Sequence, residues 1–348
     1  MDTMIPTLKH TKPSVNGSLP PVRGGHTAVL ADMQLVIFGG HAYQGKGSFE
    51  YLNDVWVLDC ASLSWQRVFC GGVAPEKRYG HSCSLVGSRM FVFGGRGPNG
   101  VLFRDMHFLD LQTWTWVPVN ATSGGPTPRF YNGSLVVGRK IVIHGGWNGE
   151  QKCFGDMWVF DTDTFTWVQP KTGGLNPPPI YGHTMNLTAN GHIMIMGGVN
   201  INGTGIPEYF NDLRSLDTAT MLWERPRHTG DFPSARYAHT MTPIGTGYVL
   251  SGGWGYGGMQ TREEGNKRSG ADSVIVLDSE KMTWAVPQQM NPNPMVHKYG
   301  HTSTNVQGLM FVFGGWNGKQ ATNDLTIVEV SNVTGDVGDA EGGNDEGK

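Results

Sequence analysis

The sequence repeats one ordered set of residues six times at intervals of about 50 residues, and no other feature constrains the fold as strongly. In each unit an apolar run ends in a Gly-Gly pair and an Asp follows, and in five units a Trp comes next. The Gly-Gly pairs occupy 39–40, 94–95, 145–146, 197–198, 252–253 and 314–315. The later residues are Asp54, Asp105, Asp156, Asp212, Asp272 and Asp324, and then Trp65, Trp116, Trp167, Trp223 and Trp284. Units so alike predict one architecture built from repeated supersecondary units.

A second signature opens each unit, upstream of the Gly-Gly pair, and combines a cation with a His three residues later. Its six versions are Arg23-Gly-Gly-His26, Arg78-Tyr-Gly-His81, Arg129-Phe-Tyr-Asn132, Ile180-Tyr-Gly-His183, Arg236-Tyr-Ala-His239 and Lys298-Tyr-Gly-His301. Asn132 replaces the His in the third unit, Ile180 replaces the cation in the fourth, and the sixth unit lacks the Trp.

Each unit also contains four short runs of β-forming residues separated by turn residues, which we letter a to d in chain order. In the second unit these runs are 81–86, 90–93, 105–110 and 114–119. The 51 Gly and 20 Pro among 348 residues exclude a mainly helical chain, because both are poor in helix interiors. One small sheet cannot bury enough apolar area alone, so we expect the six units to stack and close into a ring.

This joint pattern resembles the kelch repeat of the galactose oxidase/kelch superfamily, in which each repeat forms one four-stranded blade of a β-propeller. The resemblance covers about residues 21–330. It implies an all-β fold, a six-bladed kelch-type β-propeller, and by itself it does not specify a function.

The ring must close although the sixth unit has no run d. The spare β-type material lies at the other end of the chain, around residues 4–12. We therefore expect residues 1–20 to provide an outer strand for the last blade and a linker, with the propeller at 21–330. Residues 331–348 are acidic and Gly-rich, which predicts a disordered tail.

The length variation is concentrated in one loop of each unit. From the cation position to the first Gly the spacing is 16, 16, 16, 17, 16 and 16 residues. From the second Gly to the Asp it is 14, 10, 10, 14, 19 and 9 residues. Because the strands of a meander alternate in direction, these b–c loops and the d–a connections should emerge on one face. Variable loops on a rigid scaffold favour binding, so we predict that this face contacts a partner.

Five recurrent cations start strand a, at the predicted mouth of the central channel: Arg23, Arg78, Arg129, Arg236 and Lys298. In kelch proteins that bind peptides an Arg at this position commonly takes an acidic group, so the resemblance implies that these cations bind a partner. An acidic or carboxylate-bearing peptide would receive charge-assisted hydrogen bonds from them. The alternative is that they brace neighbouring blades by hydrogen bonding to carbonyl groups.

The residue after each Gly-Gly pair should point at the same face. These residues are His41, Arg96, Trp147, Val199, Trp254 and Trp316. Trp is a rigid amphipathic residue that is enriched in interaction hot spots, which favours a binding rim. The predicted partner-binding set therefore adds His41, Arg96, Trp147, Trp254 and Trp316 to the five cations. The alternative for each Trp is packing under its own loop.

Other recurring residues are interpreted as structural. We expect the strand-d Trp side chains to fill the wedge between blades, the repeat Asp to accept from backbone amides, and the repeat His to be a core residue. The chain lacks G-x-S-x-G, H-E-x-x-H, Walker and paired C-x-x-C motifs, so no catalytic residue, metal site or cofactor is predicted.

A metal-dependent kelch enzyme stays open as an alternative. Plant specifier proteins, which are also kelch propellers, carry a Glu-x-x-x-Asp-x-x-x-His iron motif. Segments 50–58 and 208–216 match its first two positions, but Leu stands in place of the His. Copper enzymes of the galactose-oxidase kind need two Tyr, two His and a Cys, and only Cys153 of the four cysteines lies in a b–c loop.

Charge and cysteine content bound the partner and the compartment. Without residues 335–348 the chain has 25 bases and 24 acids, a balance that predicts no nucleic-acid partner. No apolar run is long enough to cross a bilayer, and the N-terminus is too polar for a signal peptide. Four cysteines are few for a secreted protein and predict free thiols and a cytoplasmic location. Six N-x-S/T sequons keep an extracellular protein as the alternative.

These features together predict a protein-interaction module, a monomeric kelch scaffold or adaptor that binds another protein or an acidic peptide and has no membrane or nucleic-acid partner. The alternatives are a metal-dependent kelch enzyme of the specifier-protein or galactose-oxidase kind, and a secreted carbohydrate-binding propeller.

Overall fold

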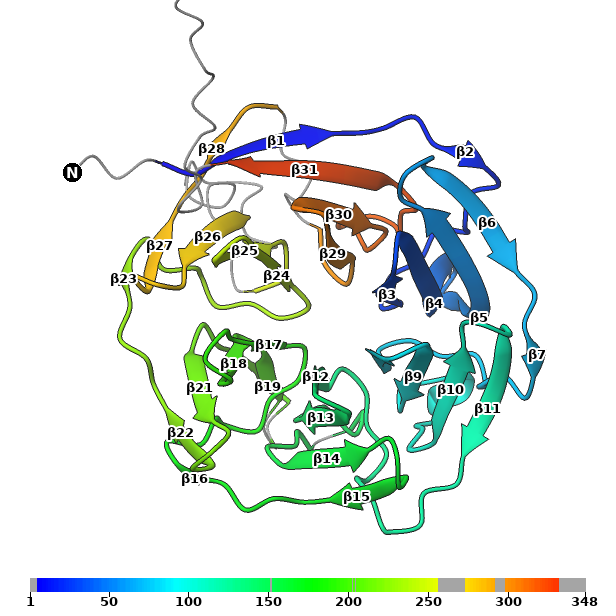
Figure 1. The fold of residues 1–348 in the computed structure, drawn as a ribbon, viewed down its shortest axis with the longest axis horizontal. Helices are drawn as coiled ribbons and strands as arrows, with labels where there is room; N and C mark the ends of the chain where they lie inside the picture. The colour runs from blue at the N-terminus through cyan, green and yellow to red at the C-terminus, as the bar shows by residue number, and fades with distance from the viewer. Residues whose placement is uncertain are drawn as a thin grey trace, which may run out of the picture.

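A computed structural model describes residues 5–150, 152–201, 203, 205–255, 273–291 and 298–331. Six blades surround a central channel, and each sheet runs from an inner strand at the channel to an outer strand at the circumference (Figure 1). The described residues include one short helix, η1 (Pro98–Gly100). Within these ranges no helix has the length and apolar character needed to cross a membrane. The prediction of an all-β, six-bladed propeller is confirmed.

The four strands of each blade follow the predicted order. Strand a is β3 (Thr27–Ala31), β8 (Ser82–Val86), β12 (Gly133–Val137), β17 (Thr184–Leu187), β24 (Thr240–Ile244) and β29 (Thr302–Val306). Strand b is β4 (Gln34–Gly45), β9 (Arg89–Phe93), β13 (Lys140–His144), β18 (Ile193–Met196), β25 (Gly247–Ser251) and β30 (Leu309–Phe313). Strand c is β5 (Ser48–Asp59), β10 (Met106–Asp110), β14 (Met157–Asp161), β21 (Leu213–Asp217), β26 (Val274–Asp278) and β31 (Leu325–Ser331). Strand d is β6 (Ser64–Val68), β11 (Thr115–Val119), β15 (Thr166–Val168), β22 (Leu222–Glu224), β27 (Thr283–Ala285) and, in the last blade, β1 (Thr7–Thr11).

The N-terminal segment closes the ring, as the sequence predicts. β1 pairs antiparallel with β31, from Thr7 opposite Ser331 to Thr11 opposite Ile327. The side chain of Leu8 is completely buried and packs in one cluster with residues of blades five and six. Strand hydrogen bonds therefore join the start of the propeller to its end and leave no long open edge. The predicted tail from 332 onward lies outside the described residues.

Short parallel strands reinforce the circumference, because the chain entering a blade pairs with the outer strand of that blade. These strands are β2 (Asn16–Gly17), β7 (Gly71–Gly72), β16 (Gly173–Gly174), β23 (Thr229–Gly230) and β28 (Gln288–Gln289). Gly72 has a φ of +77°, and a Cβ there would lie 2.1 Å from the carbonyl oxygen of Trp116. Only glycine fits so close to the outer strand in this left-handed conformation.

The apolar core lies between neighbouring blades. One cluster joins Val36 and Phe38 of the first blade to Met90, Val92 and Trp116 of the second. The five strand-d Trp side chains have exposed fractions between 1% and 7%. The prediction that they fill the wedges between blades agrees with this packing.

A closed circle of six backbone hydrogen bonds surrounds the channel. Each donor is the N–H of the residue just before the recurrent His or Asn, and each acceptor is the equivalent carbonyl one blade away. The circle runs through Gly25, Gly300, Ala238, Gly182, Tyr131, Gly80 and back to Gly25, with N···O distances of 2.6–2.9 Å. All six residues have φ between +53° and +66°, which explains the glycines of the opening signature.

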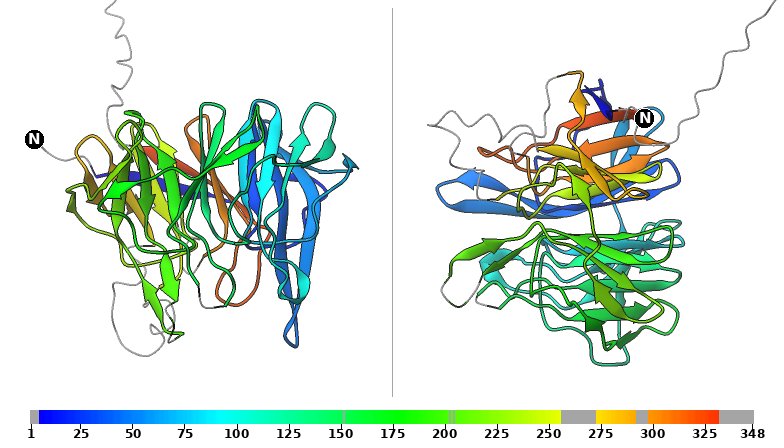
Figure 2. Two further views of the ribbon diagram at one scale, coloured as in Figure 1. Left: turned by 90° about the horizontal axis from the view of Figure 1, so that it is seen from below. Right: turned by 90° about the vertical axis from the view of Figure 1, so that its left-hand side faces the viewer.

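The described b–c loops emerge together on one side of the ring, which we call the loop face. The hairpins formed by β4 with β5 and by β19 (Val199–Ile201) with β20 (Pro207–Tyr209) project from it (Figure 2). Their blades, the first and the fourth, lie on opposite sides of the channel (Figure 1). The longest predicted loop, after Trp254, lies mostly outside the described residues.

Candidate interaction face

The recurrent cations are buried, with side chains turned into their own blades. The Arg78 guanidinium donates to the carbonyl oxygen of Gly94 at 2.9 Å and to the two carboxylate oxygens of Asp105 at 2.7 and 2.9 Å. The same pairing joins Arg23 to Asp54, Arg129 to Asp156 and Lys298 to Asp324. Exposed fractions are 0% for Arg23, Arg78 and Arg129, 2% for Lys298 and 5% for Arg236.

This burial corrects the expectation that the five cations Arg23, Arg78, Arg129, Arg236 and Lys298 face a partner. They brace the propeller instead, and the backbone completes the brace. The Arg78 N–H donates to the carbonyl oxygen of Leu52 in the preceding blade, and the Arg78 carbonyl accepts from the Gly40 N–H at 2.8 Å. A buried cation needs such a carboxylate and carbonyl shell, because an unpaired charge in the interior costs several kcal/mol.

Neighbouring cations favour the ionised form of three of the paired carboxylates, Asp54, Asp156 and Asp324. Burial opposes ionisation of Asp54, but hydrogen bonds and charge from Arg23 outweigh it and hold the pKa of that carboxyl below its ordinary value. The pKa of Asp156 is lowered for the same reason by Arg129. An aromatic ring covers the guanidinium in two blades, Phe103 at 4.0 Å from Arg78 and Phe154 at 4.1 Å from Arg129. In the five blades where the structure describes the repeat Asp, it therefore binds a side-chain cation, rather than the backbone amides that the sequence suggested.

The residues after the Gly-Gly pairs pack sideways onto the next blade. The His41 ring stacks on Tyr79 with centroids 3.9 Å apart. Trp147 stacks on Tyr181 and Trp254 packs edge-on against Tyr299, both at 5.1 Å. His41 is buried, whereas Trp147, Trp254 and Trp316 are half-buried and keep part of their surface on the loop face.

The Trp316 indole occupies space that is free because residue 24 is a glycine. A Cβ on Gly24 would lie 2.1 Å from the Trp316 indole nitrogen, so the Trp covers the position where other blades carry Tyr or Phe. This contact crosses the closing seam between the sixth and first blades. The rim Trp residues thus stabilise blade contacts while they shape the loop face.

Arg96 differs from the strand-a cations because it stands on the loop face. Its guanidinium carbon lies 5.7 Å from the centroid of the Phe130 ring and beside Gly149 of the third blade. Arg96 is half-buried beside Tyr79, and none of the ion pairs in the described part of the chain involves it. Of the predicted cations it is the one placed to receive an external acid.

Aromatic side chains that the sequence analysis did not single out form the centre of the face. We call Tyr79, Phe130, Tyr181, Tyr237 and Tyr299 the aromatic floor. Ring centroids of neighbouring members lie 5.7 Å apart between the second and third blades and between the fourth and fifth. The signal was present in the sequence, because all five residues follow the recurrent cation position.

Tyr131 stands at the channel mouth, where the equivalent residue of most blades is Gly. A Cβ on Gly25, in the first blade, would lie 3.0 Å from the Tyr131 hydroxyl. Burial, with Tyr79 and Tyr237 nearby, raises the pKa of Tyr131 well above its ordinary value. The phenol therefore stays neutral and narrows the channel at this level.

The recurrent His side chains and Asn132 line a cavity of about 140 Å³ around the channel axis. Most of the His rings bond to a neighbouring blade, as in the contacts of His81 with Thr27 at 2.8 Å and of His301 with Thr240 at 3.0 Å. Burial lowers the pKa of His81, His239 and His301 to about 3, so these imidazoles are neutral. They are core residues, as predicted.

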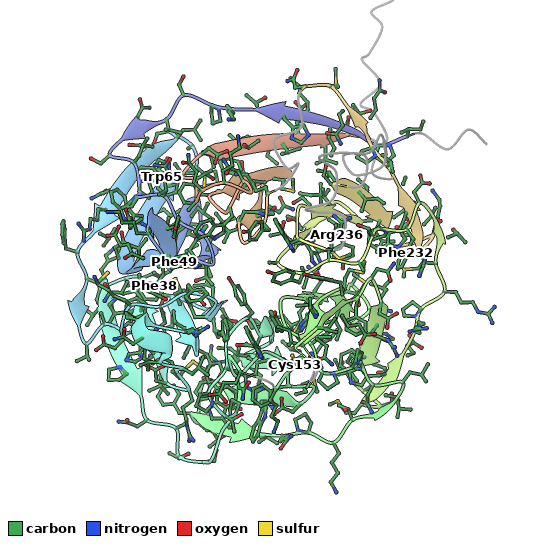
Figure 3. All side chains as sticks on the ribbon, turned by 180° about the vertical axis from the view of Figure 1, so that it is seen from behind. Phe38, Phe49, Trp65, Cys153, Phe232 and Arg236 are labelled. Atoms are coloured by element: carbon green, nitrogen blue, oxygen red, sulfur yellow. The ribbon has the colours of Figure 1, made fainter. Side chains whose placement is uncertain are left out.

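The two segments that partly match the iron motif carry ordinary repeat Asp residues. Asp54 binds Arg23, and Asp212 binds Arg214 and Arg225. In the described ranges no three His, Cys, Asp or Glu side chains gather in a way that could hold a metal ion. The four cysteines are unpaired. Cys153 accepts a hydrogen bond from the Ile201 N–H at 3.4 Å and lies near the central opening (Figure 3).

The chain is similar to parts of several longer proteins whose names differ widely. The chain is 28% identical to an acyl-CoA-binding domain-containing protein 4 of Arabidopsis thaliana, over 92% of this chain and 47% of the relative. It is 28% identical to host cell factor of Drosophila melanogaster, over 90% of this chain and 22% of the relative. It is 27% identical to serine/threonine-protein phosphatase BSL2 of Arabidopsis thaliana, over 79% of this chain and 28% of the relative. The chain thus spans less than half the length of each.

Family models match most of the chain. Residues 2–198 and 44–253 match the KLHDC2/KLHL20/DRC7 Kelch-repeats domain, and residues 297–330 match the Kelch motif. These matches, with the six blades and their recurrent braces, establish the family. The chain belongs to the kelch-repeat β-propeller family.

Proposed function

We propose that this chain is a protein-interaction module, a scaffold or adaptor that binds a partner protein on the loop face and catalyses no reaction. The observation that carries the proposal is the half-buried Arg96 guanidinium beside the aromatic floor, without a carboxylate partner in the described part of the chain. A partner carboxylate would form charge-assisted hydrogen bonds with it.

The charge of the described b–c loops supports an acidic partner. Five cations stand in these loops against three acids: Lys46, Arg96, Arg104, Lys152 and Lys319 against Glu50, Glu150 and Glu208. The Glu50 carboxylate already accepts from the Gln44 side chain. Complementary charge favours orientation and association rate more than affinity, so the half-buried floor residues Tyr79, Tyr237 and Tyr299 have to supply most of the binding energy.

The relatives support a module rather than one chemistry. An acyl-CoA-binding domain-containing protein, a host cell factor and a protein phosphatase each match this chain over only part of their length. The shared part is the propeller, and a fold joined to such different companions is expected to contribute recognition.

A random peptide library displayed on phage and selected on the full chain tests the proposal. We expect the selected peptides to be acidic, and we expect Arg96→Ala to weaken their binding about tenfold. Arg67→Ala is the matched control, because Arg67 stacks on Phe69 at the circumference. Selection of no peptide, or equal binding by the two variants, would contradict the proposed face.

We also propose a reducing, cytoplasmic setting, which the four unpaired cysteines support. Asn16 and Asn120 are exposed sequon residues, whereas Asn132 is only 8% exposed. Because a cytoplasmic protein does not receive N-linked glycans, the intact mass of the protein from its natural source should show none. Glycans at Asn16 or Asn120 would favour the extracellular alternative.

A further inference from the structure

The long hairpin of β4 and β5 places four rings on one of its sides. Residues opposite each other in the hairpin are His41 with Tyr51 and Tyr43 with Phe49. Because side chains alternate along a strand, His41, Tyr43, Phe49 and Tyr51 share one side, which we call the hairpin aromatic face. The other side carries Gln44, which donates to Glu50 at 2.8 Å.

The turn conformation and a hydrogen bond fix the geometry of this hairpin. Lys46 and Gly47 at its turn have φ of +51° and +78°, the left-handed pair that matches the twist of two-residue hairpins. The Gly47 N–H donates to the Tyr43 hydroxyl at 3.1 Å and holds that ring over the turn. Ring centroids of Phe49 lie 5.2 Å from both His41 and Tyr43.

The hairpin aromatic face is turned toward the channel and joins the aromatic floor. His41 stacks on Tyr79 of the second blade and lies 5.3 Å from Trp316 of the sixth. Phe49 lies 6.2 Å from the same Trp316. Figure 3 accordingly places Phe49 closer to the central opening than Trp65 of the outer strand.

The two rings nearest the hairpin turn are exposed, and the face as a whole is uncharged and carries hydrogen-bond donors. Tyr43 is 45% exposed and Phe49 is 41% exposed. Burial lowers the pKa of His41 to about 4, so its ring carries no charge at neutral pH. The Tyr43 hydroxyl accepts from the Gly47 N–H and keeps its own proton available to donate. A ligand here needs flat apolar groups and free acceptors, without charge.

We infer that the hairpin aromatic face and Trp316 bind a proline-rich segment of the partner protein in the polyproline II conformation. Such a segment has no internal hydrogen bonds, so its carbonyls are free to accept from tyrosine and indole donors, and its rings pack between aromatic side chains. It is preformed, which reduces the entropy lost on binding. The inference rests on the proposed function, since it uses the same face, but it is tested at Tyr43 and Phe49 rather than at Arg96.

A fluorescein-labelled decaproline peptide, titrated into the full chain and followed by anisotropy, tests the inference. We expect saturable binding that Tyr43→Ala/Phe49→Ala weakens about tenfold. Phe69→Ala is the matched control, because it removes an 82% exposed ring from the circumference. Thermal melts should show that these surface variants stay folded.

Three other results would contradict the inference, and each would do so for a different reason. No decaproline binding, with acidic peptides still captured through Arg96, would remove the polyproline contact and leave the proposed function standing. Equal decaproline binding by Tyr43→Ala/Phe49→Ala and Phe69→Ala would place the contact elsewhere. Binding of a soluble oligosaccharide in place of decaproline, lost in the same double variant, would assign the face to sugars.

Discussion

In the fourth blade, where Ile180 replaces the strand-a cation, Arg214 supplies the positive charge that pairs with Asp212. The Arg214 Nη2 donates to Asp212 at 3.0 Å, and the Arg225 Nη2 contacts the two carboxylate oxygens at 2.8 and 2.9 Å. In the first and third blades the position of Arg214 is a Trp whose indole N–H donates to the repeat Asp. The fourth blade thus keeps the paired carboxylate with a cation from strand c.

This exchange predicts a compensating pair of substitutions. Arg214→Ala should lower the free energy of unfolding by about 2 kcal/mol, because it leaves Asp212 with only the more exposed Arg225. Arg214→Trp combined with Ile180→Arg should recover most of that loss by rebuilding the brace of the other blades. Urea denaturation of the unaltered chain, of Arg214→Ala and of the double variant measures these free energies of unfolding. A double variant no more stable than Arg214→Ala would argue against equivalent roles.

Removal of a strand-a cation should damage stability rather than binding alone. Arg78→Ala leaves the Asp105 carboxylate without its partner and should cost about 3 kcal/mol of unfolding free energy. Arg139→Ala is the control, because its pair with Asp163 is exposed and should cost less than about 1 kcal/mol. Equal unfolding midpoints in urea for the two variants would refute the brace.

The hydrogen-bonded circle at the channel predicts opposite effects at two equivalent positions. Ala238 has a φ of +53°, so Ala238→Gly should raise the free energy of unfolding by about 1 kcal/mol. Gly182→Ala should lower it, because φ is +66° there and a Cβ would lie 2.9 Å from the Tyr237 ring. Differential scanning calorimetry distinguishes these signs. Destabilisation by Ala238→Gly would show that the methyl group matters more than the backbone.

The closing strand should be essential for stability. Deletion of residues 1–12 should lower the melting temperature by several degrees, because it opens the sixth blade and exposes its core. Leu8→Ala alone should cost about 3 kcal/mol, since Leu8 is 0% exposed, whereas Ile5→Ala at 63% exposure should change little. A melt unchanged by the deletion would mean that the ring holds without β1.

Acid should destabilise the propeller through its buried histidines. The folded-state pKa of His81, His239 and His301 is about 3, whereas an unfolded His titrates near 6.5. The unfolded chain therefore binds more protons between these values, and stability falls as the pH drops below about 6.5. Each such His contributes at most about 1.4 kcal/mol per pH unit.

The natural Asn132 suggests the control for this pH effect. His301→Asn should give a shallower loss of unfolding free energy between neutral and acidic pH than the unaltered chain, whatever its effect at neutral pH. Chemical denaturation at several pH values compares the slopes. Identical slopes would mean that His301 is not among the groups responsible.

Local sequence does not determine which side chains of the loop face are accessible. A cation in five repeats and an Asp in all six were visible and could have suggested a pair inside each blade. Their burial was not visible, because a strand-a cation has the same local sequence whether it faces the channel or its own blade. The contact of Trp316 with Gly24 joins residues nearly a chain length apart, so no local pattern shows it.

The sequence by itself determined the number of blades, their strand order, the closing role of the N-terminus and the loop that varies, because all of these follow from local periodicity and spacing. Only the tertiary structure decided which polar and aromatic side chains stay accessible. That depends on how each blade packs against the next: the packing buried five cations and left Arg96, Tyr43 and Phe49 within reach of a partner.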